Sequence, residues 1–155
     1  MTLSERKKMQ RAIREMLSTY EFTHFITLST NKPMVKQCRM EGMLKAFDAR
    51  LSRHVAGPKW QSHPMRPFWF ATLEKPDTHP HWHMLARIEK LPEDPEGLSS
   101  PQEHLELNIR VSWGKLCKTG SVAVRPCPDE GAQHYTTKDL ASDRAIETFA
   151  FSGGI

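Results

Sequence analysis

Two histidines and a glutamate in the middle of the chain have the residue types and spacing of metal ligands. His81 and His83 are separated only by Trp82, and Glu74 lies seven residues before His81. On a strand, successive side chains point to opposite faces, so both imidazoles would share one face while Trp82 is buried in the core behind them. Two imidazoles at this spacing can bind one metal ion, and a neighbouring carboxylate would supply a third ligand.

The alternative interpretation of the H-x-H pattern is structural. Histidine pairs of this kind also occur as surface residues or as hydrogen-bonded core residues that bind no metal. The apolar run 68–73 predicts a strand that ends just before Glu74, and the short connection 75–80 predicts a hairpin into the histidine strand. Such a hairpin would place the carboxylate beside the two imidazoles, which favours the metal site.

The elements that must position these residues are predicted from apolar periodicity and turn residues. Strands are expected at 22–29 (FTHFITLS), 68–73, 81–89 and 121–125. Helices are expected from a cap at Ser4 to Ser18, from a cap at Thr30 or Asn31 to His54, and over 101–118 and 130–140, whereas 141–155 has no clear pattern. This order predicts an α+β fold in which helices cover a central antiparallel β-sheet, as in ferredoxin-like or palm-like domains.

Length and composition exclude several classes of protein. The 155 residues, 38% hydrophobic and 26% charged, predict a single domain over 1–155 with one core. Cys38, Cys117 and Cys127 form no C-x-x-C pair, so we expect buried reduced thiols and neither a disulfide framework nor a cysteine zinc site. No apolar run approaches the roughly 20 residues of a membrane helix, so a cytoplasmic protein without a membrane segment is expected.

The charge balance and two basic helix faces suit an anionic partner. The net charge is +4 and the isoelectric point is near 9.1. Lys7 and Arg11 form a basic face on the first predicted helix, and Arg39 and Arg50 lie on the second. These faces either contact nucleic-acid phosphates or are simply solvated.

The chain contains two tyrosines, Tyr20 and Tyr135. Tyr135 and Lys138 are three residues apart on the predicted helix 130–140 and would share one face of it. Tyr20 precedes the first strand without a lysine at this spacing, and we expect it to pack as an aromatic residue at a helix end. For Tyr135 and Lys138, the structural alternative is an ordinary amphipathic helix face.

Three features occur in a characteristic order: the FITLST strand at 25–30, Glu74 before the H-W-H at 81–83, and Tyr135-x-x-Lys138. Together they resemble the HUH endonuclease superfamily, and most closely the nuclease domain of single-tyrosine rolling-circle replication initiators (Rep proteins). H-x-H alone is a weak signal, whereas the ordered set is fairly specific.

The resemblance extends over roughly residues 22–140 and implies roles for individual residues. The metal ligands would be Glu74, His81 and His83, the nucleophile Tyr135, and its motif lysine Lys138. The implied activity is nicking of single-stranded DNA at a replication origin with Mn²⁺ or Mg²⁺, leaving a covalent 5′-phosphotyrosine and a free 3′ hydroxyl. At 155 residues there is no room for a helicase domain, so a host helicase and polymerase are candidate partners.

Elementary chemistry is consistent with this assignment. A phenol with a pKa of about 10 is a poor nucleophile at neutral pH, so it needs a phosphorus atom made electrophilic by a metal ion. Two alternatives remain open. One is a single-tyrosine transposase of the same superfamily, and the other is a non-catalytic single-strand-binding module in which the histidines are incidental.

Overall fold

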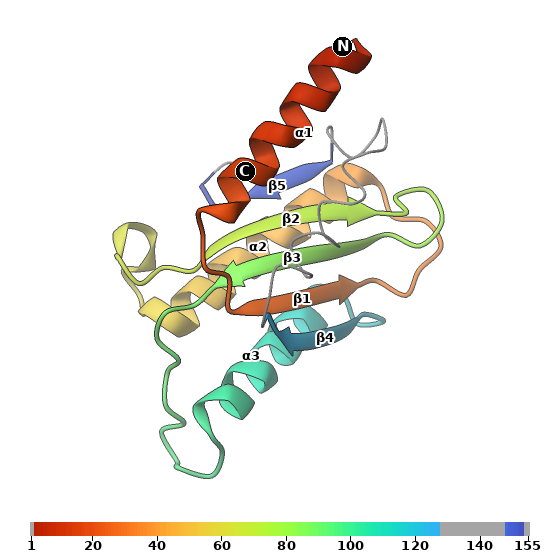
Figure 1. Cartoon of the computed structure of the whole chain (residues 1–155). Coiled ribbons are helices and arrows are strands. Elements are labelled where there is room, and N and C mark those ends of the chain that lie inside the picture. Colours follow the sequence, from red (N-terminus) through yellow and green to blue (C-terminus); the bar gives the residue numbers. More distant parts are fainter. Residues whose placement is uncertain (1, 128–147, 154–155) are drawn as a thin grey trace.

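The computed structural model describes residues 2–127 and 148–153. Within these residues the chain forms a five-stranded antiparallel sheet with strand order β4-β1-β3-β2-β5 (Figure 1). The elements in chain order are α1 (Leu3–Ser18), β1 (His24–Ser29), α2 (Gln37–Ala56), the short 3₁₀ helix η1 (Trp60–Ser62), β2 (Phe68–Glu74), β3 (His81–Arg87), α3 (Pro101–Leu116), β4 (Ser121–Pro126) and β5 (Phe149–Phe151). The predicted α+β fold with a central antiparallel sheet is confirmed.

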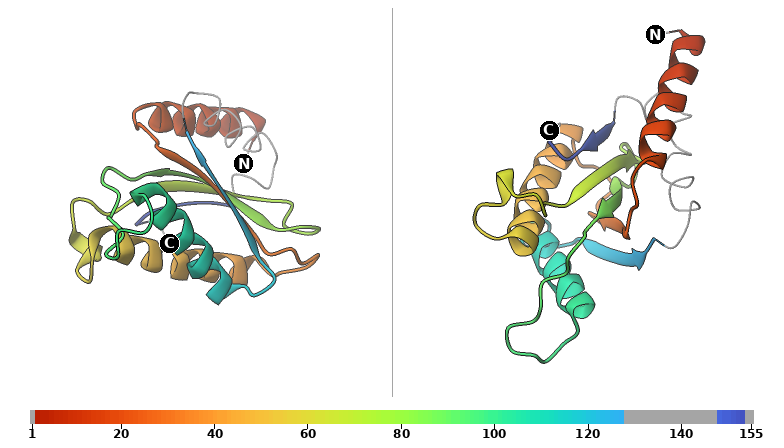
Figure 2. Two further views of the ribbon diagram at one scale, coloured as in Figure 1. Left: turned by 90° about the horizontal axis from the view of Figure 1, so that it is seen from below. Right: turned by 60° about the vertical axis from the view of Figure 1, so that its left-hand side comes forward.

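Helices cover both faces of the sheet. Figure 2 shows α1 on one side and α2 with α3 on the other. The face under α2 and α3 holds the larger core, in which Trp69, Trp82 and Met84 are fully or almost fully buried. On the opposite face, Leu17 of α1 packs with Phe70 and other apolar residues. Burial of these apolar side chains is what fixes the faces of β2 and β3.

The alternation predicted for the histidine strand is confirmed. Trp82 points into the core under α2, where its indole N–H donates to the carbonyl oxygen of Met40 at 3.1 Å. His81 and His83 therefore point to the face that α1 partly covers. The metal-ligand candidates and α1 thus share one face of the sheet.

Two helix starts differ from the prediction. In α1 the cap is Thr2, not Ser4: the Thr2 hydroxyl accepts from the Glu5 amide, and the Glu5 carboxylate accepts from the Thr2 amide. The second helix starts at Gln37 instead of near Thr30 or Asn31.

The two predicted caps of the second helix bind other parts of the fold. The Thr30 hydroxyl donates to the carbonyl of Pro80 at 3.2 Å, and the Asn31 amide donates to the carbonyl of Thr119 at 2.9 Å. Asn31 also has a left-handed backbone, with φ of 55°. Because both side chains bond other parts of the fold and the Asn31 backbone is not in a right-handed helical conformation, the helix begins six residues after Asn31.

The second half of the chain contains the predicted helix over 101–118, as α3, and one strand that was not predicted. α3 starts with a capping box between Ser100 and Glu103, as its N-terminal sequence favours. The strand β5 falls in the segment that showed no clear pattern, and pairs with β2 through Phe151 and Phe70. The predicted helix 130–140 lies outside the described residues.

The cysteines differ in part from the expectation. All three cysteines are free, but only Cys117 is buried, whereas Cys38 is exposed, so the expectation of buried thiols is wrong for Cys38. Among the helices that the structure describes, none combines the length and apolar character needed to cross a membrane.

Candidate metal centre

The hairpin between β2 and β3 brings the three candidate ligands together, as predicted. Glu74 is the last residue of β2 and lies directly opposite His81, the first residue of β3, while Thr72 pairs with His83. Antiparallel partners project to the same face, so the carboxylate and both imidazoles lie on one side of the sheet. The connecting turn begins with Lys75 in a left-handed conformation, with φ of 48°.

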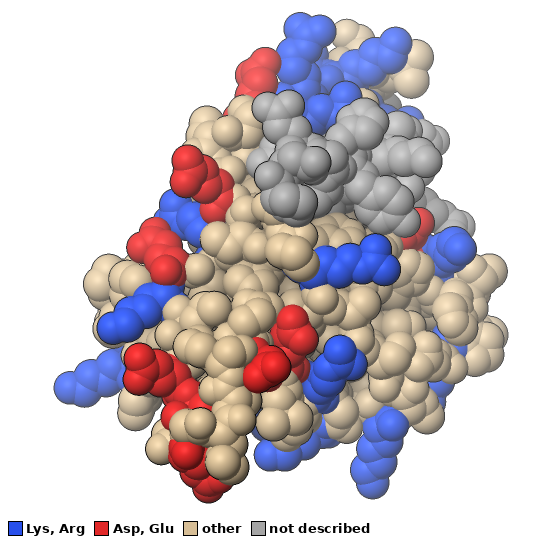
Figure 3. Space-filling model, turned by 60° about the horizontal axis from the view of Figure 1, so that its bottom comes forward, with Lys and Arg blue, Asp and Glu red and all other residues tan. Residues whose placement is uncertain are grey.

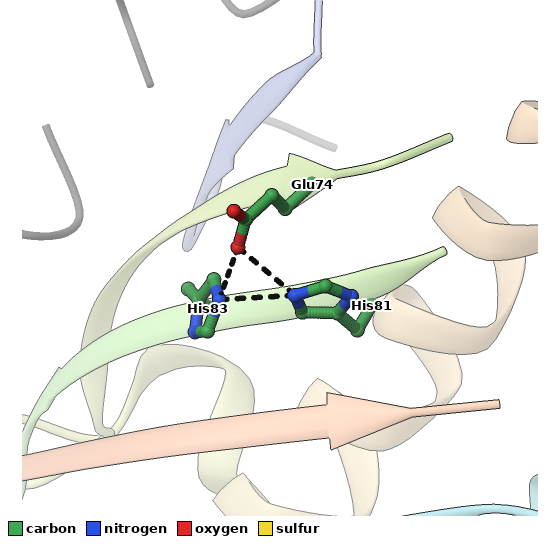
Figure 4. A group of neighbouring side chains, drawn as sticks. All are labelled: Glu74, His81 and His83. Carbon is green, nitrogen blue, oxygen red and sulfur yellow. Dashed lines mark hydrogen bonds and ion pairs between the residues drawn. The ribbon is translucent and has the colours of Figure 1, made fainter. Parts of the chain in front are cut away.

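The three side chains converge on a common point (Figure 4). Glu74 Oε2 lies 2.9 Å from His81 Nε2 and 2.5 Å from His83 Nε2, and the two Nε2 atoms are 3.1 Å apart. The exposed fraction of the side chain rises from 8% for His83 to 15% for His81 and 22% for Glu74. The cluster is therefore anchored in the protein at His83 and opens to solvent at Glu74.

Hydrogen bonds on the far side of each ring orient the histidines. His81 Nδ1 lies 2.7 Å from the carbonyl oxygen of His79, which can only accept, so Nδ1 carries the hydrogen. His83 Nδ1 lies 3.2 Å from the hydroxyl of Thr27, which can accept in the same way. In neutral His81 this bond leaves the Nε2 lone pair facing Glu74, and neutral His83 does the same in the tautomer in which Nδ1 donates to Thr27. Ligating histidines are commonly held by such a bond at their other nitrogen.

The convergence of these atoms fits a bound cation. If both rings are neutral with the hydrogen on Nδ1, His81 and His83 present only acceptors to the Glu74 carboxylate. Three acceptors at such distances repel one another unless a proton or a metal ion lies among them. Adjacent ligands on an octahedral ion with bonds of about 2.1 Å lie about 3 Å apart, close to the separations of His81 Nε2 from His83 Nε2 and from Glu74, whereas the 2.5 Å between Glu74 and His83 is that of a short hydrogen bond.

The charge state of Glu74 also suits a ligand. Partial burial disfavours its ionised form, but in the absence of a metal the charges and hydrogen bonds of protonated His83 and His81 together outweigh burial and hold the pKa of the Glu74 carboxyl below its usual value. Glu74 is therefore a carboxylate at neutral pH, as a metal ligand must be.

Small side chains border the cluster on the side away from β2. Thr27 of β1 pairs with His83 on one side and Ala123 of β4 on the other, and Ser29 pairs likewise with His81 and Ser121. We call Thr27, Ser29, Ser121 and Ala123 the sheet floor. Ala123 and Ser121 are exposed, and none of the four floor positions carries a large side chain, so within the described residues the floor itself does not block a ligand of the cluster.

Tyr20 is far from the cluster. Its ring stacks on Phe68 with centroids 4.2 Å apart, and the guanidinium of Arg87 lies over it at 5.7 Å. Phe68 and Glu74 are at opposite ends of β2, six residues or about 20 Å apart. The prediction that Tyr20 packs at a helix end is confirmed. Tyr135 and Lys138 lie outside the described residues.

Two supporting residues were missed by sequence reasoning. Thr27 bonds His83, and the ring of Phe25 stacks on the His83 ring at 5.5 Å, so both limit its rotation. The alternation within FITLST places Phe25 and Thr27 on one face. The sequence alone does not indicate which strand pairs with the strand of Phe25 and Thr27, or in which register.

Comparison with known proteins identified no relative of this chain. No protein-family model, curated protein or solved structure matches this chain. A function must therefore be inferred from the geometry of Glu74, His81 and His83 and from the order of the sequence motifs.

Proposed function

We propose that the protein is a single-stranded DNA endonuclease that nicks DNA by transfer to Tyr135, as the nuclease of a rolling-circle replication initiator. The observation that carries the proposal is the convergence of Glu74, His81 and His83 on one hairpin. The order of the motifs supports the same proposal, since the FITLST strand precedes this cluster and Tyr135-x-x-Lys138 follows it.

Glu74, His81 and His83 would hold Mn²⁺ or Mg²⁺. One carboxylate and two imidazoles leave further coordination positions for phosphate oxygens and water. When bound, a divalent ion draws charge from the non-bridging oxygens of a phosphodiester and makes its phosphorus more electrophilic. Thr27 and the His79 carbonyl keep the two rings oriented for this role.

The reaction assigned to the protein exchanges one phosphodiester for another. The phenolic oxygen of Tyr135 attacks phosphorus and loses its proton, the bond from phosphorus to the 3′ oxygen breaks, and that oxygen takes up a proton. Lys138, three residues after Tyr135 in the sequence, stabilises the phenolate by its charge. The products are a 5′-phosphotyrosine and a free 3′ hydroxyl, so the energy of the broken bond is kept and rejoining remains accessible.

The sheet floor supports a polynucleotide substrate. Because Thr27, Ser29, Ser121 and Ala123 are small, they leave space beside His81 and His83 for the sugar next to the scissile phosphate. Arg125, which is exposed at the next outward-facing position of β4, offers a positive charge along the same face.

Strand-specific labelling tests the proposal. The protein is incubated with Mn²⁺ and a random-sequence single-stranded pool labelled at either the 3′ or the 5′ end, then resolved on a denaturing gel. Because Tyr135 would retain the downstream fragment through its 5′ phosphate, we expect only the 3′ label to migrate with the protein. EDTA and the H81A/H83A variant should abolish the adduct, whereas H63A, which removes an exposed loop histidine, should not.

Two results would contradict the proposal. DNA that is bound but never cleaved would identify a non-catalytic binding module. A protein that retains the 5′ label would reverse the polarity of attack and exclude the 5′-phosphotyrosine chemistry proposed here.

A further inference from the structure

A groove lies along the rim of the sheet, beside the hairpin that carries Glu74 and His81. One wall is the segment 32–39, which leads into α2, and the other includes Pro76 and Asp77 of the hairpin turn. It consists of two hollows of about 540 Å³ and 410 Å³ that share Met34 and neighbouring residues. We call this the rim groove.

The groove is next to the candidate metal centre. Pro76 is two residues from Glu74, a distance that the chain spans in at most about 7 Å. Figure 1 shows the connection from β1 to α2 passing around the same end of the sheet as the β2–β3 turn. The groove and the centre therefore lie at the same end of the sheet, with the centre on the face that α1 partly covers and the groove beside the start of α2.

The lining combines positive charge with exposed apolar surface. Lys32, Lys36 and Arg39 are exposed and line the groove, and Asp77 is an acid among the lining residues. Met34 is 83% exposed, an unusual state for an apolar side chain beside three cations. Phosphates with accessible base faces match this combination, whereas a duplex hides its base faces and would leave Met34 unused.

Hydrogen bonds fix the groove relative to the ligand hairpin. The Thr30 hydroxyl donates to the carbonyl of Pro80, the residue before His81, at 3.2 Å. Asn31 donates to the Thr119 carbonyl at 2.9 Å and to the Ser121 hydroxyl at 3.1 Å. The start of the segment that carries Lys32 and Met34 is thus held against the strands around the metal centre.

We propose that the rim groove binds the stretch of single-stranded DNA adjoining the scissile phosphate. Lys32, Lys36 and Arg39 contact its phosphates, and Met34 contacts a base. This inference rests on the proposed endonuclease function, because it takes Glu74, His81 and His83 as the position of the scissile phosphate.

Binding measured without cleavage tests the groove separately. Fluorescence anisotropy follows a random-sequence single-stranded pool in EDTA, over a series of salt concentrations, for the K32Q/K36Q/R39Q variant. If all three cations contact phosphates, the log–log salt slope should fall by about 2, at about 0.7 per contact. M34A should weaken binding by roughly two- to tenfold without changing the slope, because it removes a base contact and no charge.

A control variant with the same loss of charge separates local contacts from net charge. R53Q/K59Q/K90Q removes three exposed cations outside the groove lining and should leave the slope nearly unchanged. Equal effects of the two triple variants, or no effect of the groove variant, would overturn the groove assignment. Both variants are measured at a temperature well below the melting temperature of each, so that only folded protein is compared.

The outcome is distinguishable from failure of the endonuclease proposal. If K32Q/K36Q/R39Q lowers the salt slope of DNA binding but the protein never forms an adduct, the groove is a DNA-binding surface and the endonuclease proposal is rejected. If the protein forms an adduct but K32Q/K36Q/R39Q binds DNA with an unchanged salt slope, the endonuclease proposal stands and the groove assignment is rejected.

Discussion

The proton position on each histidine decides what Glu74, His81 and His83 can bind. The His79 carbonyl fixes the hydrogen of His81 on Nδ1, and Thr27 occupies Nδ1 of His83. Both Nε2 atoms are thereby directed to the Glu74 carboxylate. The ligating ability of the cluster therefore depends on a residue outside it, Thr27.

Thr27→Val tests this dependence at the level of a single oxygen atom. Valine keeps the volume of threonine but cannot bond Nδ1, so we expect Mn²⁺ affinity to fall about tenfold. Isothermal titration calorimetry measures the affinity of the isolated protein. Glu74→Gln and His83→Ala should reduce binding much further, and Thr78→Val, at an exposed position of the hairpin turn, should not change it. Unaltered affinity in Thr27→Val would show that the hydroxyl has no role in the metal site.

The three ligands could be predicted from sequence, but their supporting residues could not. Alternation on one strand and a short hairpin are local properties, and they bring Glu74 opposite His81. Thr27 and His83 are 56 residues apart and meet only through the register of β1 and β3. That register depends on burial across the whole sheet, which no local pattern encodes.

At the scale of elements, a buried carboxylate joins α2 to β2. Asp48 Oδ1 accepts from the Trp69 indole at 2.7 Å and the Ser52 hydroxyl at 3.1 Å, and Asp48 Oδ2 pairs with Arg66 at 2.9 Å. The guanidinium of Arg66 also lies 4.8 Å from the centre of the Trp60 ring. One side chain therefore holds a helix, a strand and the η1 loop together.

Asp48→Ala should be among the more destabilising substitutions in the protein. It leaves the buried Trp69 N–H and the partly buried Arg66 charge without their partner, which should cost about 2 to 4 kcal/mol. Urea denaturation followed by circular dichroism measures the loss. Glu21→Ala, at an exposed position, should change the free energy of unfolding by less than about 0.5 kcal/mol. Similar values for the two variants would refute the role assigned to Asp48.

The contact between α2 and α3 should make stability depend on pH. The rings of His54 and His104 are 5.0 Å apart, and burial, followed by the charge of His104, lowers the pKa of His54 from 6.5. The unfolded chain therefore binds the His54 proton at a higher pH than the folded chain does. Consequently, the free energy of unfolding should fall as the pH drops below about 6.5.

His54→Gln isolates this contribution. Urea midpoints of the variant should decline less steeply with acidification than those of the wild type, since one protonation that favours the unfolded state is removed. Exposed His63→Gln is the matched control and should follow the wild-type curve. Parallel curves for His54→Gln and the wild type would mean that His54 does not couple folding to pH.

The start of α2 illustrates how tertiary contacts override a local signal. Thr30 and Asn31 are favoured capping residues, and Pro33 is favoured in a first helical turn. In the folded chain Thr30 bonds Pro80 and Asn31 bonds Thr119, so neither can cap the helix. These partners lie 50 and 88 residues away, beyond the reach of any capping rule.

At the scale of the whole molecule, charge is distributed unevenly. The segment 91–109 contains five acidic residues and no lysine or arginine. On the face shown in Figure 3, most of the acidic side chains lie on the left side. In contrast, α1 carries Lys7, Arg11 and Arg14 on exposed positions, and it lies on the face of the sheet that holds the candidate metal centre.

The two basic helix faces expected from sequence therefore do not form one surface, because α1 and α2 lie on opposite faces of the sheet. We expect K7Q/R11Q/R14Q to lower the salt slope of single-strand binding by about 2, and to add to the effect of the groove variant because the sites are separate. Anisotropy titrations of the single and combined variants measure both. A slope unchanged by the α1 variant would show that this face is merely solvated.

The central claim is that Tyr135 is the nucleophile served by Glu74, His81 and His83, and peptide mapping of the covalent adduct tests it most directly. After reaction with the single-stranded pool and Mn²⁺, nuclease and protease digestion followed by mass spectrometry locates the phosphotyrosine. We expect it at Tyr135, and we expect Tyr135→Phe to bind DNA without forming an adduct while Tyr20→Phe remains active. An adduct at Tyr20 or at any other residue, or an undiminished adduct in Tyr135→Phe, would contradict the mechanism.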